Sequence, residues 1–222
     1  MHFTIPISAL RYPDPVTVTR GRIDKRQAIL DAAFTVFARD GYRQAGVDTV
    51  AAAAGVAKHT VYNHFGDKQS LFRAAIEALA DDALTRNLTA LEALRVDRDA
   101  DASLTEVGRN LAICYCDEKS WALRRLLYAE LASMPDLQDI VRSRATDKVN
   151  NALADRLARL ALAGKLRIKD PAVAAEQFGA LLTAPLEARS RLGTRKIPAS
   201  ELNETVWNAV QTFLRAFGPD AR

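Results

Sequence analysis

Apolar residues recur every three or four positions along most of the chain, which is the spacing of one face of an α-helix. In the first third of the chain this pattern is split into two short pieces. Val47 and Val50 share a face of the first piece, and Val61 and Phe65 share a face of the second. Gly55 lies between them, where a residue without Cβ ends a helix without steric cost. The sequence therefore predicts two short helices joined by a glycine turn.

A polar arc lies beside the apolar face of the second short helix. It consists of Lys58, His59, Tyr62 and Asn63. Lysine donates hydrogen bonds to guanine, histidine and asparagine donate or accept at base edges, and tyrosine reaches a phosphate or a thymine methyl group. Two helices with a short turn and such an arc on the second are typical of a helix-turn-helix. Ordinary helical hairpins also contain glycine turns, so the turn alone does not distinguish a DNA-binding motif from such a hairpin. The neighbouring segments are needed to distinguish them.

Longer helical patterns flank the two short helices. Asp24 and Gln27 resemble a capping box, and an apolar stripe runs from there to Gly41. On the other side Asp67 is placed to cap a long helix that continues toward Leu91. The first helix and the two short ones together predict a three-helix unit.

Residues 1–19 contain three prolines and no helical period, which predicts a flexible N-terminal arm. The arm could follow a phosphate backbone or enter a minor groove through Arg11, Arg20 and Arg22. A leader without a role in DNA binding fits the same residues.

Helical patterns fill the rest of the chain after a charged, aperiodic loop. The predicted helices are 102–116, 121–133, a long one over 137–160, 171 to about 193, and 198–217. Pro185 is expected to kink the fourth of these or to end it early. No segment has the alternation of a strand, so the predicted fold class is all-α.

Composition and charge limit the number of domains and the class of binding partner. The 222 residues are 49% hydrophobic and 26% charged, enough for one large or two small domains with a core. The net charge is +4. Between Arg20 and Phe65 there are seven basic and four acidic residues, so most of the surplus surrounds the predicted helix-turn-helix. A polyanionic partner is compatible with this distribution.

Two cysteines are too few for a disulfide framework, and no stretch resembles a membrane span or a signal peptide. We therefore expect a soluble cytoplasmic protein with no membrane partner. On a helix, Cys114 and Cys116 point about 200° apart, so buried structural cysteines are expected rather than a metal site. Phosphate-binding loops and catalytic motifs are absent, so neither a cofactor nor an enzymatic activity is expected.

The segments around the helix-turn-helix resemble the DNA-binding domain of the TetR family of transcriptional regulators. The matching runs are ILDAAFTVFARDGY from Ile29, VAAAAGV from Val50, TVYNHF from Thr60, and Lys68 with Leu71. The resemblance implies a homodimer that binds a palindromic operator in double-stranded DNA, usually represses transcription, and is released by a small molecule. Asp170-Pro171 and Glu176-Gln177-Phe178 also resemble the regulatory domain of AefR-like members.

By this resemblance, Lys58, His59 and Tyr62 stand where family members meet bases or adjacent phosphates, and Asn63 lies in the same arc. Thr60, His64 and Lys68 stand where they meet the DNA backbone. The family commonly has Thr or Ser at the position of Gly46 and often Ser at that of Ala57, so one or two phosphate contacts are either missing here or supplied from elsewhere, for example by Thr49. Asp48 is expected to face solvent.

The predicted organisation is a helix-turn-helix domain over 20–68 and a regulatory and dimerisation domain over 69–222. The last two helices would pair with their twofold copy, with the small residues Ala174, Ala175, Gly179 and Ala180 allowing close approach. An apolar or aromatic effector is expected to bind between the helices. The candidate lining residues are Phe72, Ile76, Cys114, Tyr115, Trp121, Arg124, Tyr128 and Phe178. The alternative is an all-α dimeric protein that binds small molecules without specific DNA recognition.

Overall fold

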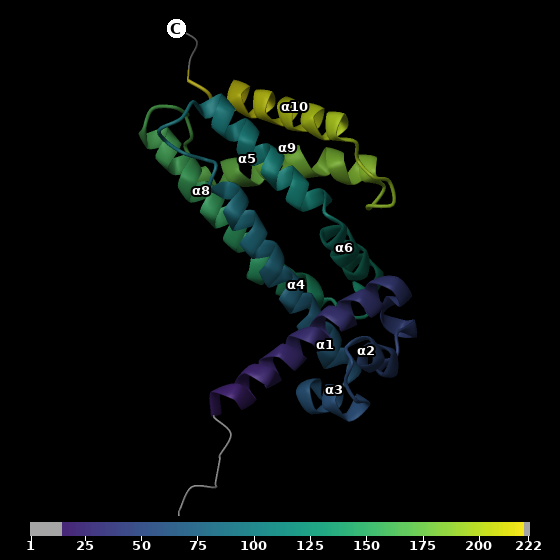
Figure 1. Cartoon of the computed structure of the whole chain (residues 1–222). Coiled ribbons are helices and arrows are strands. Elements are labelled where there is room, and N and C mark those ends of the chain that lie inside the picture. Colours follow the sequence, from purple (N-terminus) through teal and green to yellow (C-terminus); the bar gives the residue numbers. More distant parts are fainter. Residues whose placement is uncertain (1–14, 220–222) are drawn as a thin grey trace, which may run out of the picture.

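The computed structural model describes the chain from residue 15 to 219, with side chains from residue 24 onward. Every regular element in this range is a helix, which confirms the predicted all-α class (Figure 1). The elements are α1 (Pro15–Gln44), α2 (Val47–Ala53), α3 (Lys58–Phe65), α4 (Lys68–Leu91), α5 (Ala100–Cys116), α6 (Glu118–Glu130), α7 (Asp136–Val141), the π-helical segment η1 (Arg142–Thr146), α8 (Asp147–Leu162), α9 (Pro171–Ser190) and α10 (Ala199–Phe217).

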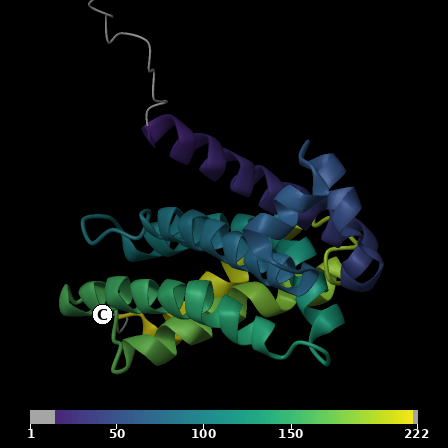
Figure 2. The same ribbon diagram turned by 90° about the horizontal axis from the view of Figure 1, so that it is seen from below.

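The first helix begins at Pro15, well before the start predicted at Asp24. Residues 15–19 of the predicted arm are therefore helical, and residues 1–14 lie outside the described range. The N-terminal part of α1 extends beyond α2 and α3 (Figures 1 and 2). Proline fits this position because the first turn of a helix lacks a partner for its N–H.

Two later predictions need correction. The long helix predicted over 137–160 is interrupted by η1, where the helix widens and Arg144 pairs with Glu77 at 2.7 Å and with Asp81 at 3.0 Å. Of the two alternatives for Pro185, the early end is wrong, because α9 continues to Ser190, and the kink stays a prediction. Proline removes one N–H donor at that point without stopping the helix.

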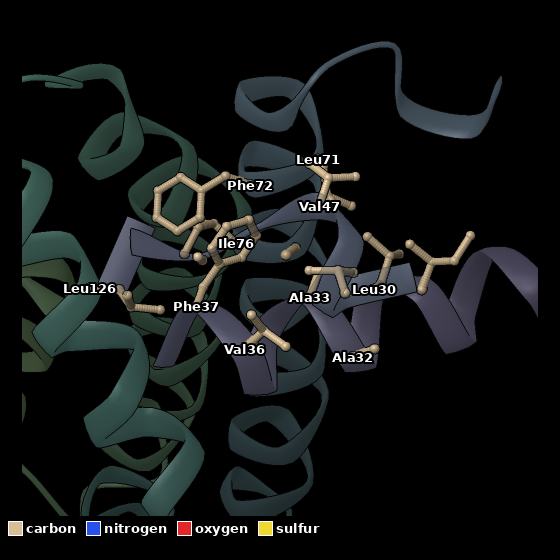
Figure 3. Packing of buried hydrophobic residues seen from close by; sticks show 14 of the residues in the cluster. Leu30, Ala32, Ala33, Val36, Phe37, Val47, Leu71, Phe72, Ile76 and Leu126 are labelled. Carbon is tan, nitrogen blue, oxygen red and sulfur yellow. The ribbon is translucent and has the colours of Figure 1, made fainter. Parts of the chain in front are cut away.

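Buried side chains form two cores. The first joins α1, α2 and α3 to the N-terminal half of α4, with Phe37 and Phe72 packed edge to face at 4.9 Å between ring centroids (Figure 3). It also contains Leu123 and Leu126 of α6 and Leu137 of α7. The second core joins the C-terminal end of α4 to α5, α8, α9 and α10. The helix α4 therefore belongs to both cores, and α6 reaches from the second unit into the first.

The outer face of α9 and α10 is apolar and open. A groove of about 510 Å³ runs between the two helices and is lined mainly by apolar residues, among them Leu181, Pro185 and Phe217. Trp207 on α10 is 57% exposed. Of the small residues on α9, the buried pair Ala174 and Ala175 packs within the chain, whereas Ala180 lines the groove. The residues that line the groove are Gln177, Ala180, Leu181, Ala184, Pro185, Thr212, Phe213, Ala216 and Phe217.

Candidate DNA-binding surface and effector site

The turn between α2 and α3 is fixed by its backbone. Gly55 has φ +65°, the left-handed conformation expected for it. The N–H of Val56 donates to the carbonyl oxygen of Ala51 at 3.0 Å, which closes the end of α2. Val50 and Val61 are fully buried on α1 and α4. The two short helices are therefore held in one orientation by a shared core.

The polar arc of α3 faces away from that core. Lys58, His59, Tyr62 and Asn63 are exposed, with Tyr62 at 41%, whereas Val61 on the opposite face is 1% exposed. The division into an apolar and a polar arc matches the sequence pattern. The contacts of these residues with DNA stay a prediction.

Lys58 is paired across the turn. Its Nζ donates to Oδ2 of Asp48 on α2 at 2.9 Å, and this hydrogen bond and the charge of Asp48 raise the pKa of the lysine. Both side chains remain more than half exposed. Asp48 thus faces solvent as expected, but it also holds Lys58 toward α2, and the ion pair has to exchange when Lys58 contacts DNA.

The residues expected at the DNA backbone are placed differently from one another. Thr49 is exposed, whereas Thr60 and His64 are half-buried. The Nζ of Lys68 donates to the carbonyl oxygen of Arg43 at 3.1 Å and lies 4.8 Å from the centroid of the Tyr42 ring. Lys68 is therefore engaged within the chain, at the first position of α4.

The helix starts behave as the sequence indicates. Neither Gly46 nor Ala57 makes a side-chain cap bond, in contrast to Asp67, which accepts from the N–H of Ser70 at 2.6 Å. A missing cap costs about 1 kcal/mol, which the shared core offsets. In α3 the N–H of Thr60 donates to the carbonyl oxygen of Ala57 at 2.9 Å instead of to a side-chain cap.

One basic residue near α3 was not among the predicted site residues. The guanidinium of Arg26 on α1 lies 5.2 Å from the centroid of the Phe65 ring, at the C-terminal end of α3. The basic surplus of the segment was visible in the sequence, but its placement beside α3 depends on how α1 packs.

The candidate effector residues do not form one site. Phe72 and Ile76 are fully buried in the first core, where Figure 3 shows them beside Phe37. Phe178 is fully buried in the second core, against Phe213 at 5.0 Å between ring centroids. These three predicted lining residues are core residues, because apolar side chains at helical spacing fill a core before they line a cavity.

Four of the predicted residues do come together, and they share a fifth that the sequence did not indicate. We name this group the Arg124 cluster: Tyr115, Trp121, Arg124, Tyr128 and Glu187. Tyr115 lies in the last turn of α5, and Glu187 lies on α9. The other three residues, Trp121, Arg124 and Tyr128, lie on α6. The cluster thus joins helices that are distant in the sequence.

Hydrogen bonds and ring contacts define the Arg124 cluster. The hydroxyl groups of Tyr115 and Tyr128 donate to the two carboxylate oxygens of Glu187, at 2.9 and 2.8 Å. The guanidinium carbon of Arg124 lies 3.8 Å from the ring centroid of Tyr115 and 3.9 Å from that of Trp121. Arg124 also donates to the backbone carbonyl oxygen of Tyr115.

Burial dominates the ionisation of this cluster. It raises the pKa of Tyr115 strongly and lowers that of Arg124, because each charged form loses water. Burial also raises the thiol pKa of Cys114 and Cys116, which are free and half-buried. The cysteines are thus less buried than predicted, and their structural role stays a prediction.

Within residues 24–219 no group of three or more His, Cys, Asp or Glu side chains is arranged to hold a metal ion. Over the same part of the chain, no helix combines the length and the hydropathy that crossing a membrane requires.

Comparison with known proteins gives two family matches. Residues 29–75 match the model of bacterial regulatory proteins of the TetR family, and residues 102–219 match the C-terminal domain of AefR-like transcriptional repressors. The first match covers the helix-turn-helix, and the second covers most of the rest of the described chain.

Individual relatives agree with these matches. The repressor KstR2 of Rhodococcus jostii is 36% identical over 70 residues, which are 32% of this chain and about a third (34%) of that relative's length. A helix-turn-helix repressor of Mycobacterium tuberculosis is 32% identical over 87% of this chain and 91% of its own. A TetR-family regulator structure from Mesorhizobium loti superposes with a TM-score of 0.81 at 27% identity, covering 89% of this chain and 98% of that one.

Proposed function

The chain belongs to the TetR family of bacterial regulatory proteins, with an AefR-like C-terminal domain, and from this premise we propose that it represses transcription as a homodimer on a palindromic operator. A small aromatic molecule bound in the Arg124 cluster releases it. The protein acts in the cytoplasm, where its operator is. The observation that carries the proposal is the exposed polar arc of α3, held in place by the buried Val61.

The arc supports base recognition by its chemistry. Tyr62, Asn63 and His59 offer donors, acceptors and an aromatic face at one side of α3, and Lys58 adds a positive charge. Arg26 beside Phe65 adds a second positive charge near the C-terminal end of α3. Such a surface suits a major groove with phosphates on either flank.

A dimer is needed because one α3 covers too little DNA for useful specificity. The apolar groove between α9 and α10, with Trp207 exposed nearby, is the surface we assign to the partner. Twofold pairing there would form a four-helix bundle and set the two α3 helices at half-sites about 34 Å apart or a multiple of that distance.

The position of α6 supports a coupling between effector and DNA. One side of α6 carries Arg124 and Tyr128 of the cluster, and its other side places Leu123 and Leu126 in the first core. A ligand that shifts α6 changes the packing of α1 and α4. Two conformations that differ in the spacing of the α3 helices would then bind operator with different affinity.

Ion pairs between α4 and the segment after α6 extend this contact. Arg73 donates to Asp136 of α7 at 2.7 Å, and Arg144 of η1 bridges Glu77 and Asp81 of α4. These pairs bind α7 and η1 to the half of α4 that belongs to the first core. Because α7 follows α6 in the chain, we propose that a shift of α6 reaches α4 through these ion pairs as well as through the first core.

A gel shift with the DNA upstream of the chain's own gene tests the proposal. We expect a complex that is selective for this DNA over random DNA and weakens steeply with salt. Lys58→Ala should weaken it, whereas Lys148→Ala, which removes an exposed lysine on the distant α8, should not. A dimer that binds small molecules but shows no selective complex would instead favour a binding protein without DNA recognition.

A further inference from the structure

We propose that the Arg124 cluster is an aromatic cage for a planar organic cation, and that Arg124 of the chain itself occupies this cage in the absence of ligand. The inference rests on the proposed function, in which this cluster is the effector site, and it names the chemical class of the effector.

The cage is formed by two rings. Tyr115 and Trp121 meet edge to face, with 5.2 Å between ring centroids and 75° between ring planes, so they form a corner. The guanidinium carbon of Arg124 lies within 4 Å of both ring centroids. The faces of aromatic rings are negative and attract cations. The corner is thus already a cation site, and the cation in it is planar.

A carboxylate at the open side completes the site. Glu187 accepts from the hydroxyl groups of Tyr115 and Tyr128 rather than from Arg124, although its negative charge acts to raise the pKa of Arg124 against the larger effect of burial. Tyr128 is 52% exposed and Glu187 is half-buried, so this end of the cluster borders solvent. A ligand entering from this side meets the negative charge first. That arrangement attracts a cation and repels an anion.

Arg124 is held less completely than a structural arginine. Its Nε is buried and has no hydrogen-bond partner among the described residues, and burial lowers its pKa. Its hydrogen bond to the carbonyl oxygen of Tyr115 can be replaced by water at the surface. When Arg124 leaves the corner, its guanidinium returns to water, and this hydration offsets part of the free-energy cost of its displacement by a ligand.

The wall behind Trp121 is rigid. A Cβ on Gly193 would lie 2.4 Å from Cγ of Trp121, so only glycine lets the turn between α9 and α10 approach the ring this closely. Arg191 and Leu192 precede it with φ +51° and +58°, a conformation that costs energy in residues with a side chain. Arg125 donates to the carbonyl oxygen of Leu192 at 3.3 Å. With Trp121 fixed, the group that moves when a ligand binds is Arg124, which occupies the cage.

Movement of Arg124 has a direct path to the DNA-binding domain. Leu123 is its neighbour in sequence and Leu126 follows within one turn, and both are buried in the first core. A cation that expels Arg124 shifts the turn of α6 that carries all three residues. The release of DNA then follows from the same contact that supports the proposed function.

Calorimetric titration of the full chain without DNA tests the ligand class. Three planar two-ring probes differ mainly in charge: N-methylquinolinium is a cation, 2-naphthol is neutral at pH 7, and 1-naphthoate is an anion. We expect N-methylquinolinium to bind about tenfold tighter than 2-naphthol, and 1-naphthoate to bind weakest. Glu187→Gln should weaken cation binding about tenfold by removing the carboxylate charge.

Arg124→Gln gives the sharpest test, because it empties the corner. It should tighten binding of N-methylquinolinium, whereas Arg109→Gln, an exposed arginine on α5, should leave it unchanged. Preference of the unmodified chain for 1-naphthoate, with loss of that binding in Arg124→Gln, would overturn the proposal in favour of an anion paired with Arg124. Absence of binding by all three probes to the unmodified chain would overturn it too.

The two proposals fail separately. The titrations contain no DNA, so cation binding can be present even if the chain recognises no operator. A gel shift with N-methylquinolinium then asks whether the bound cation releases the operator. If Arg124→Gln does not fold, the order of the three binding affinities on the unmodified chain and on Glu187→Gln still tests the ligand class.

Discussion

The helices α3 and α6 are built alike and differ in what covers their polar side. Each is anchored by apolar residues in the first core, Val61 for α3 and Leu123 with Leu126 for α6. The polar arc of α3 is open to solvent, and only Lys58 is tied by an ion pair. The polar side of α6 is closed by aromatic rings around Arg124. One surface can bind a partner with little rearrangement, whereas the other has to give up an internal contact first.

This difference assigns different roles to the two helices. A surface that is already exposed and rigid suits recognition of a fixed shape such as a DNA groove. A site that binds only after an internal group leaves changes the packing of the helix that carries it.

Leu126→Ala tests whether α6 is part of the DNA-binding domain's core. Leu126 is 5% exposed, and removing a buried leucine side chain leaves a cavity, so we expect the free energy of unfolding to fall by about 2–4 kcal/mol. Chemical denaturation measures the change. Leu162→Ala is the control, because Leu162 is 90% exposed and its loss should have little effect. Equally small changes in the free energy of unfolding of both variants would contradict the assignment of α6 to the first core.

Tyr62→Ala tests the open surface of α3. Tyr62 is exposed and makes no contact that the fold requires, so the dimer should remain intact while operator affinity falls by about 1–3 kcal/mol. Gel shift and size-exclusion chromatography measure the two quantities. Unchanged affinity would show that the polar arc of α3 does not contact the operator.

Asp48→Asn tests whether the one ion pair on this surface restrains it. Without the charge of Asp48, Lys58 is free to contact DNA, so affinity should rise several-fold and the dependence on log salt should steepen by about one phosphate contact. Binding at several salt concentrations measures the slope. Asp155→Asn removes an exposed acid on α8 and serves as the control. An unchanged slope would mean that Lys58 stays away from phosphate.

The closed side of α6 predicts a pH effect. Burial raises the pKa of Tyr115, so the folded chain keeps a proton that the unfolded chain loses near pH 10. The unfolded state then binds fewer protons, and stability falls as pH rises above that value. In Tyr115→Phe this contribution is absent. Denaturation from pH 9 to 11 should therefore show a shallower decline in the variant, and parallel declines would contradict a buried Tyr115.

The recognition helix could be predicted because its features are local. The glycine turn, the buried Val61 and the exposed Tyr62 lie within one short segment, so helical spacing alone separates the two arcs. The ion pair of Lys58 with Asp48 was missed, since spacing does not show which side chains meet across a turn. The early start of α1 was missed because residues 15–23 carry no apolar period from which a helix could be predicted.

The effector site depends on contacts that are distant in sequence. Tyr115 and Glu187 are 72 residues apart and meet only through the packing of α5 against α9. Phe72 and Phe178 have the same aromatic character as Tyr115, and residue type alone could not assign them to cores. Four of the eight predicted residues fall in one cluster, but its carboxylate gave no signal because an isolated glutamate on a helix usually faces solvent.

The central claim is that α3 reads a twofold operator. Nuclease footprinting on the DNA upstream of the chain's own gene tests it most directly. We expect protection of two inverted half-sites separated by about one helical turn of DNA or a multiple of it. This protection should be lost in Tyr62→Ala at the same protein concentration. Protection that is uniform along the DNA, or that persists unchanged in Tyr62→Ala, would contradict it.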